Sequence, residues 1–490
     1  MRWSLNLMNG NRLQTSRDWR WIILLLLVAA GLVLSSCSPV ASGPTPTPTK
    51  TPRPAQPPTL PPGPTVTPPV ELSPEPQNVT GTVAPSSTTP PTEGPVASAT
   101  ILSSPTAAAP TATKPAATKA PVRTGGSMSS PDFGMQAFLW WREEVADRDL
   151  GLLKDAGFNW VKQYFAWQDI EGAGKGQFDW TQTDRIIDQV EKHGLKLLVR
   201  VSQDPDRPFW AGNAPDNSQH FAEFLAALAK RYKGRIGAYQ IWNEPNLARE
   251  WGNKRPDPAG YAQMLRLAYK AIKANDPSAT VVTAGMAPTT QDDAIAMPDL
   301  KFYQGMYDAM KKNSDGYFDM LGVHGAGYAV APETDPQVVA TDPKLHNNDP
   351  SPTELKRVYA FRHIEDVRAL MVRNGDEDKR VVVLEFGWTT DPRPNSPYYW
   401  HGGGAGIKEA VKGDYLVRAY QWASEHWQPW IALMSGIYMP DVDWTKEDEQ
   451  YYWSIIGPAY PDTNWRAAYI KLCIYLNGLK GVRCKWDPNQ

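Results

Sequence analysis

Two glutamates in this chain each follow a short apolar run. Glu244 stands in "QIWNEPN", residues 240–246, between an asparagine and a proline, and Glu385 follows four aliphatic residues in "VVVLEFGW", residues 381–388. One such carboxylate can simply mark the point where a buried strand reaches water. Two of them at one end of the same sheet would form a pair, and a pair in unequal environments can divide acid and nucleophile roles.

Short apolar segments alternate with helical patterns from residue 131 onward, and two helical patterns, 147–157 and 180–194, end at a glycine suited to a helix C-terminus. Near-continuous apolar strands indicate burial on both faces, as in a parallel sheet covered by helices. The pattern therefore predicts an α/β fold, a (β/α)8 TIM barrel. The eight expected strands are 134–140, 159–165, 195–202, 237–244, 279–286, 318–325, 380–388 and 430–439.

A doubly wound open sheet is the alternative architecture. Such sheets often carry a G-x-G-x-x-G phosphate loop directly after a strand. No such motif follows a strand in this sequence. The glycine run 401–406 lies in a long segment after the seventh expected strand, so we interpret it as a flexible loop.

Polar residues stand at the ends of several expected strands, where a barrel of this kind carries its active site. Asn243 and Glu244 end the fourth strand, His324 the sixth and Glu385 the seventh. Two carboxylates facing one another across a pocket suit the hydrolysis of a glycosidic bond.

That reaction needs one carboxyl group protonated and the other ionised. Apolar neighbours of Glu244 favour its protonated form, and Lys162 or Arg200, on the second and third strands, would keep Glu385 ionised. Asn243 is placed to hydrogen-bond the 2-hydroxyl of a sugar, a contact that strengthens in the transition state.

The segments "WNEPN" and "LEFGW" resemble the two active-site motifs of glycoside hydrolase clan A, the retaining (β/α)8 hydrolases, and the chain is similar to families 39 and 5 within it. The resemblance extends from residue 131 to about residue 479. It implies that Glu244 is the acid/base, that Glu385 is the nucleophile, and that His324 in "GVHGAGY" lies near the sugar.

The sequence departs from the clan's pattern at two positions. Lys162 stands where many members carry arginine, and a point ammonium does not replace a bidentate guanidinium cleanly. Tyr438, or Trp444 further along, stands where many members have a tryptophan under the bound sugar.

Tryptophan is abundant, with 20 residues in the chain, and flat aromatic faces can hold sugars. Packing explains any one of them, but we expect at least two of six near strand ends to line a sugar cleft: Trp140, Trp141, Trp167, Trp210, Trp388 and Trp400. The predicted substrate-binding set is Asn243, His324, Lys162, Trp388, Tyr438 and Trp140. We expect no metal and no cofactor.

The N-terminal residues predict export and a membrane anchor. Arginines precede the apolar run 21–34, and "LSSC" at 34–37 resembles the lipobox of bacterial lipoproteins, in which Cys37 would carry the lipid. A retained transmembrane signal anchor is the alternative. Residues 38–130 hold 23 of the 46 prolines and no aromatic residue, which predicts a disordered Pro/Thr-rich linker. The catalytic domain is then 131–490, on the cell surface.

The balance of charged residues argues against nucleic acid as a partner. With 50 basic and 52 acidic residues, the net charge of −2 gives no basic surface for nucleic acid.

Oxidising conditions outside the cell make a Cys473–Cys484 disulfide possible, and two free thiols remain the alternative.

The leading hypothesis is a membrane-tethered retaining hydrolase that acts, as a monomer, on oligo- or polysaccharides joined by β-linkages. A non-catalytic carbohydrate-binding barrel and a transglycosylase with the same carboxylate pair are the other two readings.

Overall fold

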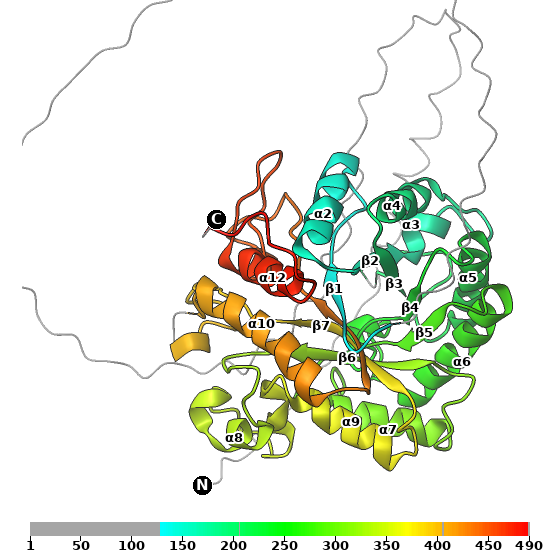
Figure 1. The fold of residues 1–490 in the computed structure, drawn as a ribbon. Coiled ribbons are helices and arrows are strands. Elements are labelled where there is room, and N and C mark those ends of the chain that lie inside the picture. Colours follow the sequence, from blue (N-terminus) through cyan, green and yellow to red (C-terminus); the bar gives the residue numbers. More distant parts are fainter. Residues whose placement is uncertain (1–127, 205, 404–405, 489–490) are drawn as a thin grey trace, which may run out of the picture. The chain divides into compact units, whose positions relative to one another are not determined.

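The computed structural model describes residues 128–204, 206–403 and 406–488. Eight parallel strands close into a barrel in sequence order, with β1 paired to β8, so the predicted barrel is confirmed and the open sheet is excluded (Figure 1). Every expected strand is present. Their bounds are β1 Asp132–Gln136, β2 Trp160–Ala166, β3 Lys196–Ser202, β4 Ala238–Ile241, β5 Thr280–Thr283, β6 Met320–Ala326, β7 Arg380–Gly387 and β8 Ile431–Gly436.

Helices surround the barrel (Figure 1). Sequence sets their ends: Asp257 accepts hydrogen bonds from the first free N–H groups of α6, and Gly157 closes α2 at a φ of 96°. The longer helices are α2 Glu143–Ala156, α4 Thr181–Lys192, α5 Ser218–Arg231, α6 Pro258–Asn275, α7 Asp299–Ala309, α9 His363–Arg373, α10 Glu409–His426 and α12 Ala467–Gly478. The shorter ones are α3 Trp167–Glu171, α8 Pro336–Thr341, α11 Glu449–Trp453, η1 Ala248–Glu250, η2 Pro343–Leu345, η3 Leu355–Tyr359 and η4 His401–Gly403.

An apolar layer formed by strand residues packs together apart from the larger core beneath the helices. It includes Trp160, Leu198 and Ala238 from β2, β3 and β4. Side chains two positions apart on a strand share a face. The next residues on that face are Lys162, Arg200 and Gln240, so polar groups lie directly above the apolar layer, toward the carboxyl ends of the strands.

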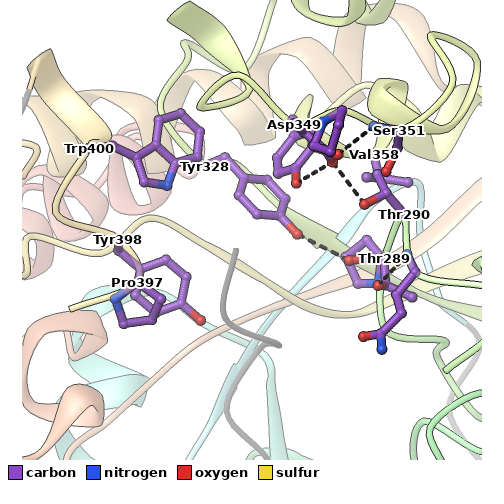
Figure 2. A pocket seen from close by; sticks show the side chains of 13 residues that line it. Thr289, Thr290, Tyr328, Asp349, Ser351, Val358, Pro397, Tyr398 and Trp400 are labelled. Atoms are coloured by element: carbon purple, nitrogen blue, oxygen red, sulfur yellow. Dashed lines mark hydrogen bonds between the residues drawn. The ribbon is translucent and has the colours of Figure 1, made fainter. Parts of the chain in front are cut away.

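Long connections follow β6 and β7 on the same end of the barrel. The segment 327–362 contains α8, η2 and η3, and the segment 388–408 contains η4. Residues of both segments, together with residues that follow β5, line a cavity (Figure 2). The predicted flexible loop at 401–406 is corrected at His401, whose side chain is fully buried against the ring of Trp400.

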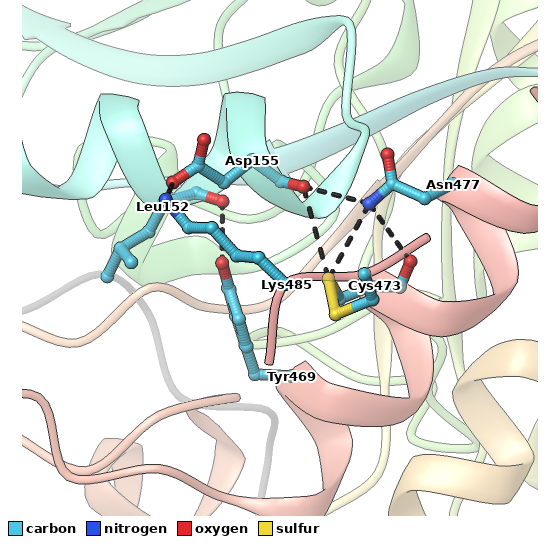
Figure 3. The surroundings of a disulfide bond; sticks show 7 residues. Leu152, Asp155, Tyr469, Cys473, Asn477 and Lys485 are labelled. Atoms are coloured by element: carbon cyan, nitrogen blue, oxygen red, sulfur yellow. Dashed lines mark hydrogen bonds and ion pairs between the residues drawn. A yellow bond between two sulfur atoms is a disulfide. The ribbon is translucent and has the colours of Figure 1, made fainter. Parts of the chain in front are cut away.

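The structure joins Cys473 of α12 to Cys484 in a disulfide, with the two Cα atoms 5.5 Å apart (Figure 3). Asn477 donates from Nδ2 to the backbone carbonyl of Asp155 in α2 at 2.8 Å. Lys485 forms an ion pair with the side chain of Asp155. These contacts attach the C-terminal segment to the first helix of the barrel.

The predicted signal peptide 1–37, the lipid site Cys37 and the linker up to residue 127 lie outside the described residues, so they stay predictions. Among the residues that are described, no helix is long and apolar enough to cross a membrane.

Candidate active site

The two glutamates are brought to the same end of the barrel by β4 and β7. Both side chains are buried. Glu385 lies within β7 and is the register neighbour of His324 on β6, after a shift in the pairing between Val323 and His324. Such irregularities re-aim side chains next to active sites. The shift places His324 beside Glu385 in the strand pairing, while the imidazole ring of His324 contacts Glu244.

Glu385 is held by a buried cation. Lys162 Nζ lies 2.8 Å from Glu385 Oε1 and donates a second hydrogen bond to the carbonyl of Leu384 at 3.1 Å. Burial alone would raise the pKa of Glu385, but the charges of Lys162, His324 and Arg200 outweigh it and hold that pKa at about 2. Burial lowers the pKa of Lys162 to about 8, against the attraction of Glu385. Both groups are therefore charged at neutral pH.

Glu244 is held differently. His324 Nδ1 lies 3.0 Å from Glu244 Oε1, and an Arg249 nitrogen lies 3.7 Å from Oε2. The backbone N–H of Glu244 donates to the carbonyl of Gly285 at 3.1 Å. Glu244 and Trp242 have φ angles of 40° and 71°, in a backbone region that residues other than glycine seldom occupy. Such conformations cluster at functional sites, where the surrounding structure enforces them.

The second asparagine of "NEPN" explains how this turn is fixed. Asn246 donates from Nδ2 to the carbonyls of Ala287 and Met297, both at 2.9 Å, and accepts from the N–H of Ala287 at 2.9 Å. One side chain thus ties the β4 turn to the segment after β5. Because Glu244 is two residues away, this clamp also limits where its carboxyl group can move.

Gly285 allows the close approach of His324 to Glu244. A Cβ atom at position 285 would lie 2.1 Å from His324 Cδ2, far inside contact distance. Only glycine therefore leaves room for the imidazole in its observed position.

Several buried polar atoms around the glutamates have no hydrogen-bond partner among the described residues. Buried polar groups are normally paired, because an unpaired one costs about 1–3 kcal/mol. A cluster of them is the arrangement expected where a polyhydroxylated ligand completes the bonding. The atoms are Gln136 Oε1, Arg200 Nε and Nη1, Asn243 Nδ2, Glu244 Oε2, His324 Nε2 and Ser435 Oγ.

Tyr438, which follows β8, lies near both glutamates. Burial raises its pKa well above the usual value, and Glu385 and Glu244 raise it further. Its ring packs edge-on against Phe138 and Trp444, with ring centroids 5.7 and 5.6 Å away. The structure thus brings Tyr438 to the site, and Trp444 supports it from behind.

Two predicted sugar contacts fare differently. Trp388 is fully buried, and its indole nitrogen donates to the carbonyl of Val330 at 2.8 Å. We therefore correct its role to packing beneath the loop after β6. Trp140 is half-buried and packs edge-on against Phe165 at 6.1 Å. Its role as a sugar contact stays a prediction.

Sequence reasoning missed Arg249 and Glu250. Glu250 is buried near Arg200 and Glu244. Burial raises its pKa to about 8; Arg200 opposes that rise and Glu244 adds to it. Both residues come from the short helix η1 after the β4 turn. No strand end or motif marks them in the sequence, so only the path of the loop reveals them.

Within the described ranges, no three His, Cys, Asp or Glu side chains gather in a group that could hold a metal ion.

Comparison with known proteins finds a family whose model matches part of the chain. Residues 117–324 match the model of the cellulases, glycosyl hydrolase family 5. The matched range contains Glu244 and ends at His324, so Glu385 lies outside it. A β-galactosidase, BbgII of Bifidobacterium bifidum, is 37% identical over a region that covers 30% of this chain and 27% of that protein. The match thus spans about a quarter of the relative's own length.

A glucosidase of known structure shares the fold, and a second solved structure superimposes less well. A glucosidase from Croceicoccus marinus superimposes with a TM-score of 0.50 at 13% identity, covering 73% of this chain and 70% of that one. A family 39 glycoside hydrolase from Bacteroides cellulosilyticus WH2 gives a TM-score of 0.48 at 18% identity, covering 72% and 64%. The family match over part of the chain, together with the glutamate motifs, makes the chain similar to the hydrolases of glycoside hydrolase clan A.

Proposed function

We propose that this protein is an exported, lipid-anchored retaining hydrolase that cleaves β-linked oligo- or polysaccharides by double displacement. The observation that carries the proposal is the unequal pair at the barrel end: Glu385 is ion-paired to Lys162 at 2.8 Å, and Glu244 contacts His324 at 3.0 Å. A retaining pair also requires the two carboxyl groups to be about 5–5.5 Å apart.

In the first step Glu385 attacks the anomeric carbon of the sugar. The bond between that carbon and the leaving oxygen breaks, and Glu244 transfers its proton to the leaving oxygen. His324 contacts Oε1 of Glu244, while Oε2 is buried without a hydrogen-bond partner among the described residues, so we assign the proton transfer to Oε2. The products of this step are a glycosyl ester on Glu385 and a free alcohol.

In the second step water attacks the same carbon. Glu244, now ionised, takes a proton from the water, and the carboxylate of Glu385 leaves. The low pKa of Glu385 helps here, because a carboxylate stabilised by Lys162 is a better leaving group. Both glutamates return to their starting protonation states.

Asn243 is assigned to the sugar 2-hydroxyl. Its Nδ2 is buried without a partner among the described residues, and Gln240 Nε2 lies 3.4 Å from its Oδ1. That contact orients the amide so that its N–H groups point away from Gln240. A donor held in this way can strengthen its bond as charge develops on the ring.

Export, the lipid on Cys37 and the extended linker belong to the proposal on the strength of the sequence alone. Metabolic labelling with a fatty acid tests the anchor. Wild-type protein should carry the label, and Cys37→Ser should not.

A substrate panel tests the activity. Xylan, mannan, β-glucan and aryl β-glycosides are incubated with purified protein, and proton NMR follows the first anomer released. We expect the β-anomer to appear first. The α-anomer first would contradict retention, longer oligosaccharides would indicate transglycosylation, and binding without turnover would favour the non-catalytic barrel.

A further inference from the structure

The cavity formed after β5, β6 and β7 has a volume of about 340 Å3, which lies within the roughly 300–1,000 Å3 range of small-molecule sites (Figure 2). Neither catalytic glutamate lines it. Its walls come from the connections that follow β5, β6 and β7 at the open end of the barrel. They include Trp400, Tyr398, Tyr328, Asp349, Thr289 and Gln291.

This cavity is linked to the Glu244 side of the site through Tyr328, one of its lining residues. Tyr328 follows His324 by four residues, and its hydroxyl donates to the carbonyl of Pro288 at 3.1 Å. Pro288 in turn follows Ala287, which Asn246 clamps to the β4 turn. Burial is the main cause of the raised pKa of Tyr328, and the charge of Glu244 adds to it. The cavity therefore lies on the acid/base side of the site, where the leaving group must sit.

The shape of the cavity is fixed by a buried carboxylate. Asp349 Oδ2 accepts from Thr290 and Tyr359, each at 2.8 Å, and Oδ1 accepts from the N–H of Ser351 at 2.8 Å. Burial would raise the pKa of Asp349, but these hydrogen bonds lower it below its usual value. Tyr328 has a φ of 48°, a further strained position that this packing holds.

The lining combines flat rings with polar groups. Trp400 is half-buried, and Figure 2 shows it with Tyr398 on one side of the cavity and Asp349 with Thr290 on the other. Aromatic faces pack against the C–H faces of a sugar ring, and hydroxyl, amide and carboxylate groups bond its hydroxyls. The described lining residues carry one carboxylate and no lysine, arginine or histidine. An anionic sugar would therefore be repelled.

We propose that this cavity is a subsite for a neutral sugar unit on the leaving-group side of the scissile bond, with Trp400 as its platform. The inference rests on the proposed function, since it assigns the second sugar of the same substrate. It predicts a preference for oligosaccharides over single glycosides, and for neutral chains over those with a uronic acid at that position.

Kinetics of Trp400→Ala test the subsite. Against a neutral oligosaccharide from the active part of the panel, kcat/KM should fall about tenfold or more, since aromatic anchors in pockets dominate binding. Against a β-glycosyl fluoride of a single sugar, whose one-atom leaving group does not reach the cavity, the change should stay below about threefold. Trp400→Phe, which keeps a flat ring, should recover part of the loss. Trp422→Ala, a half-buried tryptophan on the outer helix α10, is the matched control and should leave both rates unchanged.

Binding separates the two proposals. Calorimetric titration of the same oligosaccharide into Glu385→Gln, with and without Trp400→Ala, needs no turnover and should show about a tenfold weaker Kd in the double variant. If the wild type hydrolyses no substrate of the panel but Trp400→Ala still weakens binding of the oligosaccharide, the proposed function fails and the sugar site in the cavity stands. Equal losses on both substrates, or an unchanged Kd and an unchanged oligosaccharide rate, would overturn the subsite and leave the function standing. Thermal melts confirm that each variant is folded.

Discussion

The two glutamates share one end of the barrel, but their surroundings divide the chemistry between them. Glu385 lies within strand β7 and forms an ion pair with Lys162 at 2.8 Å, which keeps it ionised. Glu244 lies in a strained turn, where a histidine contacts one oxygen and an arginine lies 3.7 Å from the other. A nucleophile must stay ionised, whereas an acid/base must gain and lose a proton in every cycle. The close ion pair with Lys162 suits the nucleophile role of Glu385. The looser contacts with His324 and Arg249 suit the acid/base role of Glu244.

The largest expected effect comes from removing the fixed charge. Glu385→Gln keeps the shape of the side chain and cannot form the glycosyl ester, so kcat should fall by roughly 10^4-fold or more. Initial rates on the best substrate of the panel measure this. The variant should keep the circular dichroism spectrum of the wild type, and activity within tenfold of wild type would refute the nucleophile assignment.

Glu244→Gln should produce a loss that depends on the leaving group. For a sugar or alkyl leaving group, which needs the proton, kcat/KM should drop by about 10^2–10^4-fold. For a dinitrophenyl glycoside, whose leaving group needs no proton, the drop in kcat/KM should be far smaller. A uniform loss across leaving groups would mean that Glu244 is not the acid.

Lys162→Met should move the pH profile. Without the ammonium, burial is less opposed and the pKa of Glu385 rises from about 2, so more of the carboxyl is protonated at mildly acidic pH. The acid limb of kcat/KM should therefore shift upward by about 1–3 pH units. Lys162→Arg keeps the positive charge and is the control, with the acid limb close to that of the wild type. An unmoved limb in Lys162→Met would show that other cations hold Glu385.

The smallest effect is expected on the side of Glu244. Gly285→Ala places a Cβ 2.1 Å from the ring of His324, so the imidazole must shift and its contact with Glu244 must lengthen. We expect kcat to fall by about tenfold and the melting temperature to drop by several degrees, because overpacking costs about 1–3 kcal/mol. Gly478→Ala, at an open position at the end of α12, controls for loss of a glycine. If activity is unchanged while the melting temperature drops, His324 has no part in positioning Glu244.

The sequence predicted the barrel well because strand burial and helix ends are local patterns. Runs such as 195–202 and 380–388 are apolar on both faces, and the observed strands Lys196–Ser202 and Arg380–Gly387 agree with them. The position of the proposed catalytic pair at one end of the barrel follows from the rule that strand ends meet at one edge. Lys162 and Arg200 could be placed for the same reason.

The parts that sequence could not predict depend on the path of loops. Trp388 directly follows the end of β7, yet the loop after β6 folds over it. Its indole nitrogen donates a hydrogen bond to the carbonyl of Val330 in that loop. Arg249 reaches Glu244 only because η1 turns back over the β4 end. Asp349 lies far along a long connection, and its role in shaping a cavity needs Thr290 from the segment after β5 and Tyr359 from η3 of the same connection.

Trapping the glycosyl ester tests the central claim most directly. A 2-deoxy-2-fluoro glycoside of the preferred sugar, with a dinitrophenyl leaving group, slows the second step more than the first. Mass spectrometry of the digested protein should then show the fluorosugar on the peptide that contains Glu385, with one sugar per chain. A label on any other residue, or full turnover of the natural substrate to the inverted anomer with no adduct, would contradict the account.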